Sequence, residues 1–311
     1  MKILIVGFGQ LGSRYLQGFC KLPGTTVVHV VEPNNYAFEL GVEVSGVKAF
    51  PSVLLFRKTV DTVDAEYDVV VVATSSRPRA DLVESLAARI VSNGWVLEKI
   101  LAQSLRDLNR IEAALKGQKA WVNTPRRITS LYKAFKTVLA GRGPLSFNLQ
   151  VPGFALGCNS IHFIDVVSWL SDSPVERVDI TADSKGWYGA KREGYEEFNG
   201  KLIAHYSGGS TLTIDNTCIE SKAQVVCDVG NDSFLLVESK GVYCGGELLL
   251  EGYVEYQSEL STDLAMRIIE GDLDNFLPTL SESIHQHKAF FFGLMNDNTL
   301  SPNDQSDWRI T

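Results

Sequence analysis

Three parts of this sequence combine residue types and spacings that could do chemistry. The stretch GFGQLG at residues 7–12 is a glycine-rich turn of the kind that holds phosphates. Residues 98–99, Glu-Lys, end an apolar run, and a lysine in such a place can relay a proton. Asn159, His162 and Asp165 are spaced so that they would share one face of a helix. These groups indicate a cofactor-binding turn and two candidates for acid–base chemistry.

The glycine stretch has the surroundings of a dinucleotide-binding unit. The apolar run at residues 3–6 predicts a buried strand before it, and residues 10–20 have helical spacing after it. A second apolar run at residues 27–31 ends in Glu32, which stands about 20 residues past the last glycine, as the dinucleotide fingerprint requires. The alternative is a glycine-rich turn that only packs a βαβ unit.

Each residue of the turn has an expected role in cofactor binding. Gly7 would allow the tight turn, Gly9 would let a pyrophosphate approach the backbone, and Gly12 would let the helix pack close to the strand. Gln10 and Leu11 begin the predicted helix, where free N–H groups and the positive end of the helix dipole favour phosphate.

The acidic residue bears on the choice of cofactor. Glu32 can accept the ribose hydroxyls of an adenosine, and its carboxylate would repel a 2′-phosphate. The next residues, Pro33, Asn34 and Asn35, bring no lysine or arginine that would neutralise such a phosphate. We therefore expect NAD as the cofactor, with NADP less favoured.

Length and composition bound the remaining possibilities. The 311 residues suggest two domains, and the formal net charge of −8 without a long basic patch argues against nucleic acid or an anionic membrane as partners. No apolar run approaches the ~20 residues that span a bilayer. An odd number of cysteines without a C-x-x-C pair favours reduced thiols in a cytoplasmic protein and predicts no metal site. The five cysteines are Cys20, Cys158, Cys218, Cys227 and Cys244.

Strand and helix patterns alternate over residues 1–122, which predicts an α/β Rossmann domain with a six-strand parallel sheet. Two of its apolar strands lead into Thr74 and Ser75 and into Glu98. An open parallel sheet binds its ligand at the carboxyl ends of its strands. We therefore expect these three residues to contact the cofactor.

Residues 123–311 have a different pattern, with several short alternating strands and few helices between them. They predict an α+β domain with an open, mostly antiparallel sheet and helices on one side. A C-terminal segment can pack back on the first domain. The uncovered face of the sheet predicts a homo-oligomer, and the alternative is a face that polar residues solvate. The closely spaced residues 285–287, His-Gln-His, are expected at the surface.

Lys99 and His162 are the candidates for proton transfer. A partly desolvated Lys99 at a strand end would lie where the nicotinamide is expected, although a lysine in a loop is more often solvated. His162 suits an acid–base role near neutral pH, and Asn159 and Asp165 would orient the substrate or this histidine. The alternative is a core histidine bonded to Asp165.

With these residues in place, the chain resembles the Gfo/Idh/MocA family of oxidoreductases over nearly its whole length. The landmarks are GFGQLG at 7–12, ATSS at 73–76, EK at 98–99, NTPRR at 123–127, and the H-x-x-D of His162 and Asp165 followed by Trp169 and Leu170. The resemblance implies hydride transfer between NAD(P) and a carbinol carbon of a sugar, sugar nucleotide or cyclitol. It also implies that Lys99 and His162 touch the reacting hydroxyl.

The sequence departs from the family pattern at three positions. Ile100 replaces the proline of the usual E-K-P, and Cys158 stands where an aspartate or asparagine is common. Arg79 stands near the place of a usual histidine and could select a charged substrate. Arg126 and Arg127 could bind a phosphate or carboxylate of the substrate, with Arg127 the candidate contact, or they could be ordinary surface or cofactor-loop arginines.

The sequence therefore predicts an NAD-dependent dehydrogenase that acts on a sugar-like small molecule. The departures at Ile100 and Cys158 motivate one alternative, a non-catalytic NAD-binding sensor or partner protein. A second alternative, in which the redox step serves a lyase or glycosidase cycle, uses the same residues.

Overall fold

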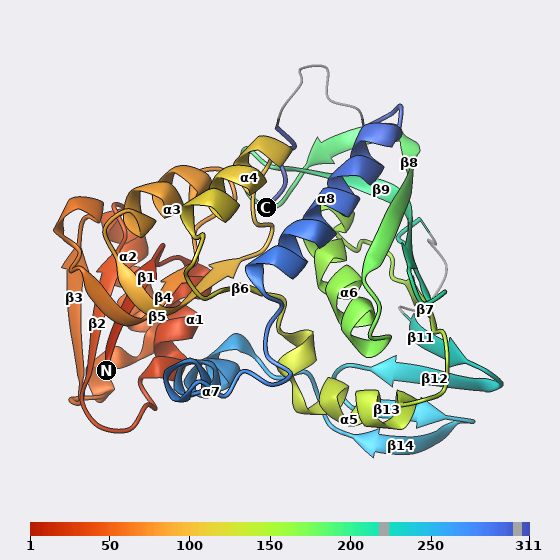
Figure 1. The fold of residues 1–311 in the computed structure, drawn as a ribbon, viewed down its shortest axis with the longest axis horizontal. Coiled ribbons are helices and arrows are strands. Elements are labelled where there is room, and N and C mark those ends of the chain that lie inside the picture. Colours follow the sequence, from red (N-terminus) through yellow and green to blue (C-terminus); the bar gives the residue numbers. More distant parts are fainter. Residues whose placement is uncertain (218–223, 301–306) are drawn as a thin grey trace. The chain divides into compact units, whose positions relative to one another are not determined.

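The computed structural model describes residues 1–217, 224–300 and 307–311, so Cys218 lies outside the described residues. The chain forms two compact units (Figure 1). The first unit comprises Met1–Ala102, Arg106–Asn123 and Glu255–Ser281, and the second comprises Gln103–Leu105, Thr124–Val254 and Glu282–Thr311. Each unit contains one large sheet.

The first unit is built on a six-stranded parallel sheet, as the alternating pattern predicts. The strand order is β3-β2-β1-β4-β5-β6. The four central strands are rich in valine, isoleucine and leucine and are buried on both faces toward their carboxyl ends, because helices cover both sides of a parallel sheet (Figure 1). The strands are β1 (Lys2–Val6), β2 (Thr26–Val31), β3 (Val53–Lys58), β4 (Glu66–Val72), β5 (Val91–Glu98) and β6 (Ala120–Asn123).

The helices of this unit connect successive strands, except one that comes from far along the chain. They are α1 (Gln10–Phe19), α2 (Asn35–Ser45), α3 (Arg79–Ala87), α4 (Leu105–Ala114) and α7 (Gln257–Glu270). α7 packs on α1 at Gly18, where an added Cβ would lie 2.5 Å from the Cβ of Ser261. Thr262 Oγ1 also donates to the Gly18 carbonyl at 2.7 Å. This close packing joins the late segment to the first unit.

The second unit contains a mixed eight-stranded sheet in the order β14-β13-β12-β11-β7-β10-β9-β8. Only the pair formed by β7 and β10 is parallel among its described pairs, so the predicted mostly antiparallel sheet is confirmed. The strands are β7 (Ser146–Gln150), β8 (Val175–Gly189), β9 (Glu196–Tyr206), β10 (Thr211–Asp215), β11 (Gln224–Val229), β12 (Asp232–Val237), β13 (Gly241–Cys244) and β14 (Glu247–Glu251).

Helices cover one face of this sheet. They are α5 (Ser130–Leu139), α6 (Leu156–Leu170) and α8 (Leu280–Asn296). Tyr206 of β9 donates its hydroxyl to the Ile164 carbonyl of α6, and the close approach of Gly293 of α8 to Val178 of β8 places that helix on the same face. The side chains of alternate residues point to the other face, where the row Ile203, Thr213 and Asn148 is partly exposed.

Candidate active site

The glycine stretch of the first unit has the geometry expected of a phosphate-binding turn. Gly7 adopts φ 89°, and a Cβ there would lie 2.9 Å from the Thr74 nitrogen. A Cβ on Gly12 would lie 2.1 Å from the Gly7 carbonyl oxygen, so this position requires glycine. A Cβ on Gly9 would meet nothing within 4 Å. The backbone at Gly9 therefore faces open space of the kind that an approaching pyrophosphate needs.

The first turn of α1 supports the same use. α1 begins at Gln10, its N-cap is Gly9 without a side-chain cap, and its first turn carries no acidic residue. The N–H groups of Gln10 and Leu11 point out of the helix end, where no intrahelical carbonyl can accept them. Backbone donors and the positive end of the helix dipole thus meet at the open space.

Glu32 is fixed at the end of β2 by two backbone donors. The Phe8 N–H donates to Glu32 Oε2 at 2.9 Å, and the Asn34 N–H donates to Oε1 at 3.0 Å. The carboxylate is half-buried beside the glycine turn. Phe8 itself is buried against α2, where a Cβ on Gly41 would lie 2.5 Å from its ring. These contacts fit an adenosine ribose whose hydroxyls donate to the carboxylate.

A cation that the sequence pattern does not indicate lies at this loop. Arg57 lies at the end of β3, and its guanidinium donates to the carbonyls of Glu32 and Pro33 and to the side chain of Asn35. β3 pairs with β2 in parallel, with Arg57 opposite Val30, which brings the arginine to the same sheet edge. Residues 33–35 themselves do not indicate that Arg57 lies beside them. Its position follows from the pairing of β3 with β2.

The other predicted cofactor residues lie at the carboxyl ends of β4 and β5. Thr74 and Ser75 follow β4 and are half-buried. Glu98 ends β5 and is almost fully buried, and its Oε1 accepts hydrogen bonds from Tyr15 at 2.7 Å and from Asn123 at 2.6 Å. Burial raises the pKa of Glu98, although the bonds from Tyr15 and Asn123 oppose that shift. Glu98 is thus a core carboxyl below the sheet edge.

Lys99 follows directly and is half-buried. The Lys99–Ile100 peptide bond is cis, and Ile100 is fully buried. Lys99 belongs to the first unit, whereas His162 belongs to the second.

The suggestion that Arg79 selects a charged substrate is wrong for this fold. Arg79 begins α3 and is 1% exposed. Its guanidinium donates to the carbonyls of Thr74, Ile100 and Leu101. A buried arginine bonded to backbone carbonyls has no access to a substrate. It instead joins the loop after β4 to the loop after β5, which carries Lys99.

α6 presents the polar face that the spacing predicts. Asn159 and His162 are half-buried, whereas Asp165 is fully buried. The N-terminus of α6 is closed by Glu197 of β9, whose carboxylate accepts the N–H groups of Gly157 at 2.7 Å and Cys158 at 2.9 Å. A carboxylate there is favourable because it meets the positive end of the helix dipole. The N-terminal half of the polar face is therefore partly exposed, whereas its C-terminal end at Asp165 is buried.

Asp165 is the centre of a buried hydrogen-bond network in the second unit. Its carboxylate accepts from the Nε of Arg127 at 3.1 Å and from the same guanidinium's Nη2. Thr124 Oγ1 donates to it at 2.7 Å and Gln286 Nε2 at 3.0 Å. The alternative of a surface arginine is wrong for Arg127, which is 6% exposed. The guanidinium edge that could bind a carboxylate holds Asp165.

The prediction that residues 285–287 lie at the surface is also wrong for two of the three. Gln286 and His287 are buried, and only His285 is exposed. Gln286 points from α8 to Asp165. The spacing of these residues does not show which of them are buried, because one residue of α8 can face the core while its neighbour faces solvent.

Arg126 forms a second, half-buried ion pair. Its guanidinium donates to Glu238 at 2.7 and 3.1 Å and lies 4.1 Å from the ring centroid of Phe163 on α6. Burial alone would raise the pKa of Glu238, but the charge of Arg126 and the hydrogen bonds from Arg126 and Tyr132 together hold that pKa below its usual value. Two arginines of the NTPRR stretch thus stabilise the packing of α6.

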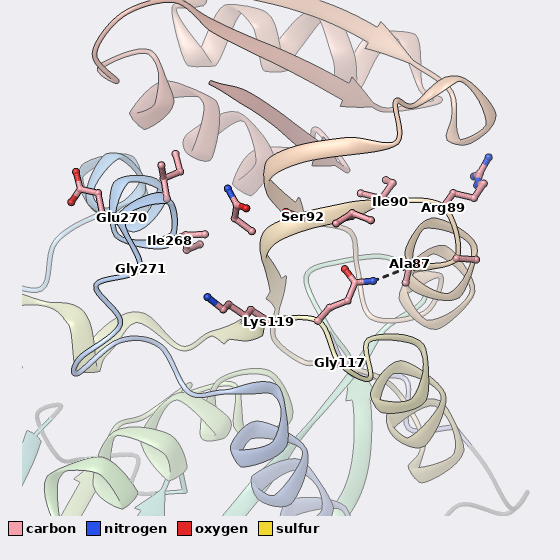
Figure 2. Close-up of a pocket in the computed structure, with 14 residues that line it drawn as sticks. Ala87, Arg89, Ile90, Ser92, Gly117, Lys119, Ile268, Glu270 and Gly271 are labelled. Atoms are coloured by element: carbon pink, nitrogen blue, oxygen red, sulfur yellow. Dashed lines mark hydrogen bonds between the residues drawn. The ribbon is translucent and has the colours of Figure 1, made fainter.

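The first unit contains a pocket of about 630 Å³ (Figure 2). Ser92 near the start of β5, Lys119 just before β6, and Glu270 with Gly271 at the end of α7 line it. These are the amino ends of the strands, whereas a parallel sheet binds its cofactor at the carboxyl ends. We therefore do not assign the cofactor to this pocket.

Two of the described cysteines are too basic for nucleophilic chemistry. Burial raises the pKa of Cys20 to about 11 and that of Cys227 to about 12. A thiol with such a pKa is almost wholly protonated at neutral pH. Neither residue is a candidate for the site.

The fold and the glycine turn together define a dinucleotide-binding protein. Residues 1–124 match the family model GFO_IDH_MocA, described as an oxidoreductase family with an NAD-binding Rossmann fold. This match confirms the resemblance to the Gfo/Idh/MocA family over residues 1–124. NAD is a cofactor of that family by the same description.

Solved structures with the same fold span both units. The chain is similar to scyllo-inositol dehydrogenase from Lactobacillus casei with bound NAD(H) and scyllo-inositol, at 14% identity and TM-score 0.65, covering 94% of this chain and 95% of that one. It is similar to UDP-N-acetylglucosamine 3-dehydrogenase from Acidithiobacillus ferrooxidans, at 12% identity and TM-score 0.68, covering 97% and 99%. It is also similar to biliverdin reductase from Synechocystis in complex with biliverdin and NADP⁺, at 14% identity and TM-score 0.66, covering 94% and 97%.

At these identities the likeness concerns the fold. No curated protein matches the sequence. No helix within the described residues is long and apolar enough to cross a membrane.

Proposed function

We propose that this protein is an NAD-dependent oxidoreductase that transfers a hydride between the nicotinamide and a carbinol carbon of a sugar, sugar nucleotide or cyclitol. The observation that carries the cofactor part is the open backbone at Gly9 beside the fixed carboxylate of Glu32. Two of the three similar structures are dehydrogenases of an inositol and of a sugar nucleotide, which supports the substrate class.

NAD is the proposed cofactor in preference to NADP. Both oxygens of Glu32 accept backbone N–H groups, so the carboxylate is held in place at the expected ribose position. A 2′-phosphate there would meet this negative charge. The donors of Arg57 are engaged by Glu32, Pro33 and Asn35, which argues against its use as a phosphate ligand.

Lys99 and His162 are the proposed groups for proton transfer. Bound NAD would accept or supply the hydride at the carbinol carbon. Either Lys99 or His162 would take the proton of the substrate hydroxyl during oxidation and return it during reduction. Both are half-buried, so each can meet a ligand while its surroundings exclude much of the water.

The remaining predicted residues have different parts in this proposal. Asn159 is the proposed substrate contact on α6, because it is half-buried and shares the face of His162. Asp165 and Arg127 are proposed to hold α6 in place instead of touching substrate, because both are buried and bonded to each other. Thr74 and Ser75 are proposed cofactor contacts at the end of β4.

The test is the formation of NADH. NAD would be supplied with a panel of inositols, hexoses and nucleotide sugars, and NADH absorbance would be followed. Turnover with one class would support the proposal and identify the substrate. Tight NAD binding without turnover on the whole panel would favour a non-catalytic sensor or partner protein, the alternative that the departures at Ile100 and Cys158 motivate.

We also propose that the protein self-associates through the uncovered face of the second sheet. Cross-strand pairing aligns Val226, Leu235, Tyr243 and Leu248 in one row on β11 to β14, and all four are at least partly exposed. Such a row of apolar side chains is typical of a face that another surface covers. Light scattering of the native protein and of a Leu235→Lys variant tests this, since only an oligomer through this face would dissociate. The cytoplasmic location stays a prediction from cysteine usage.

A further inference from the structure

Arg57 has an unusual set of contacts for an exposed arginine. Its Nε donates to the Glu32 carbonyl at 2.9 Å, and its Nη2 donates to the carbonyls of Glu32 at 2.7 Å and Pro33 at 2.9 Å. Its Nη1 donates to Asn35 Oδ1 at 2.6 Å. The rigid guanidinium fork thus binds three oxygens of one loop, residues 32–35.

The loop that Arg57 holds is the one that carries the ribose-binding carboxylate. This loop runs from β2 into α2, and its polar groups are exposed apart from Glu32 itself. The carbonyl of Glu32, which accepts twice from Arg57, belongs to the same residue whose carboxylate accepts from Phe8 and Asn34. Arg57 therefore holds the backbone of Glu32, and the two N–H groups hold its side chain.

A row of ring contacts links the arginine to the glycine turn. The Arg57 guanidinium lies 4.9 Å from the ring centroid of Phe38 on α2, and the Phe38 and Phe8 ring centroids are 5.7 Å apart. Phe8 stands between Gly7 and Gly9. The position of Arg57 is thus fixed by α2 and by the turn together, so its fork is pre-organised for the loop.

We propose that Arg57 is a positioning residue for cofactor selection, which holds residues 32–35 so that the Glu32 carboxylate is set to accept the two adenosine ribose hydroxyls of NAD. Without the arginine, the loop would sample other conformations. The apparent affinity for NAD would then fall in proportion to the fraction of molecules that keep the carboxylate in place. The proposal rests on the NAD-binding part of the proposed function and is independent of the hydride-transfer part.

A double-mutant cycle tests whether Arg57 acts through Glu32. NAD affinity would be measured by calorimetry for the wild type, Arg57→Met, Glu32→Ala and the double variant. We expect Arg57→Met to raise the Kd for NAD about tenfold, as the loss of several hydrogen bonds that order a loop would predict. In the Glu32→Ala background we expect the same change to have little further effect, because the carboxylate that it positions is gone.

The Kd for NADP provides a second readout. A general loosening of the first unit would weaken the binding of NAD and NADP alike, whereas the proposal predicts a change mainly for NAD. The 2′-phosphate of NADP cannot use the carboxylate as the ribose hydroxyl does, so the Kd for NADP should change much less than that for NAD. Arg57→Met should therefore narrow the preference for NAD. Arg57→Lys keeps the charge but cannot bridge three oxygens, so we expect it to resemble Arg57→Met.

Arg89→Met is the matched control. Arg89 is also an exposed arginine of the first unit that donates to backbone carbonyls, those of Ser85 and Val60, and it holds no part of residues 32–35. Its loss should leave the Kd for NAD unchanged.

Three results would overturn the proposal. One is an unchanged NAD affinity in Arg57→Met, and another is a full additional loss when the change is made in Glu32→Ala, which would mean that Arg57 acts on NAD independently of Glu32. The third is an Arg57→Lys variant that binds NAD as the wild type does. A wild-type protein that binds NAD but turns over no substrate would contradict the catalytic proposal alone.

Discussion

The glycine turn with Glu32 and the polar face of α6 carry the two halves of the proposed chemistry, and they are built in opposite ways. The turn offers backbone N–H groups, open space at Gly9 and one half-buried carboxylate. The α6 face ends in Asp165, which is fully buried and bonded to Arg127 and Gln286. Changes at the turn should therefore affect affinity, whereas changes around Asp165 should affect folding.

The largest expected effect is that of Lys99→Met, which tests the proposed proton transfer at the end of β5. The loss of a general acid–base group should lower kcat about a thousandfold. The Kd for NAD should stay within about twofold, because the glycine turn is unchanged. Steady-state kinetics and NAD titration measure both quantities. Lys116→Met, at an exposed lysine beyond the end of α4, is the control and should change neither. Normal turnover in Lys99→Met would remove Lys99 from the mechanism.

Asp165→Asn tests the other side of the comparison. It leaves the buried guanidinium of Arg127 without its carboxylate, which should lower the free energy of unfolding by about 3 kcal/mol or more. Asp172→Asn is the matched control, because Asp172 pairs with Lys136 at 2.6 Å and is largely exposed. Its loss should cost less than about 1 kcal/mol. Equal effects of the two changes in urea denaturation would contradict the distinction drawn here.

Gly9→Ala and Gly12→Ala divide binding from folding within the turn. A methyl group at Gly9 meets no protein atom, so the unfolding free energy should change by less than about 1 kcal/mol. The methyl group would occupy space that a pyrophosphate needs, and the Kd for NAD should rise about tenfold or more. The methyl group at Gly12 would collide with the Gly7 carbonyl, so this variant should unfold more easily. Normal NAD affinity in a folded Gly9→Ala variant would show that the phosphates bind elsewhere.

The smallest expected effect is a pH dependence from Glu98. Its pKa is raised in the folded state by burial, so the folded state binds a proton more readily than the unfolded state. Stability from this group is present below the ordinary pKa of 4.5 and falls as the pH rises through the raised value, by at most about 1.4 kcal/mol per pH unit. The stability of Glu98→Gln relative to the wild type should therefore increase with pH above 4.5. Parallel stability curves would contradict the raised pKa.

The sequence was sufficient to place those parts of the candidate site that are formed by residues close together in the chain. The glycine turn, Glu32 and Lys99 are each read from a strand and the residues that follow it, and helical spacing placed Asn159 and His162 on one face. These features depend on backbone geometry that short stretches of sequence determine.

The sequence was insufficient where partners come from distant segments. Arg57 reaches Glu32 across 25 positions, Arg127 reaches Asp165 across 38, and Gln286 reaches Asp165 across 121. Neither strand order nor helix packing can be deduced from one sequence. An arginine that holds a loop and an arginine that binds a ligand therefore look the same in the sequence. Arg79 is an example. Its position in the sequence suggested a contact with the substrate, but its burial in the structure excludes that contact.

The most direct test of the cofactor site is the thermal midpoint of the nucleotide-free protein with NAD, with NADP, and with NAD plus each member of a panel of sugars, cyclitols and nucleotide sugars. A ligand that binds only the native state stabilises it by about 2.7 kcal/mol at a hundredfold excess over Kd. We expect the midpoint to rise with NAD, to rise less with NADP, and to rise further with one substrate class. No rise with either dinucleotide would contradict the assignment of the turn from Gly7 to Gly12 as a cofactor site.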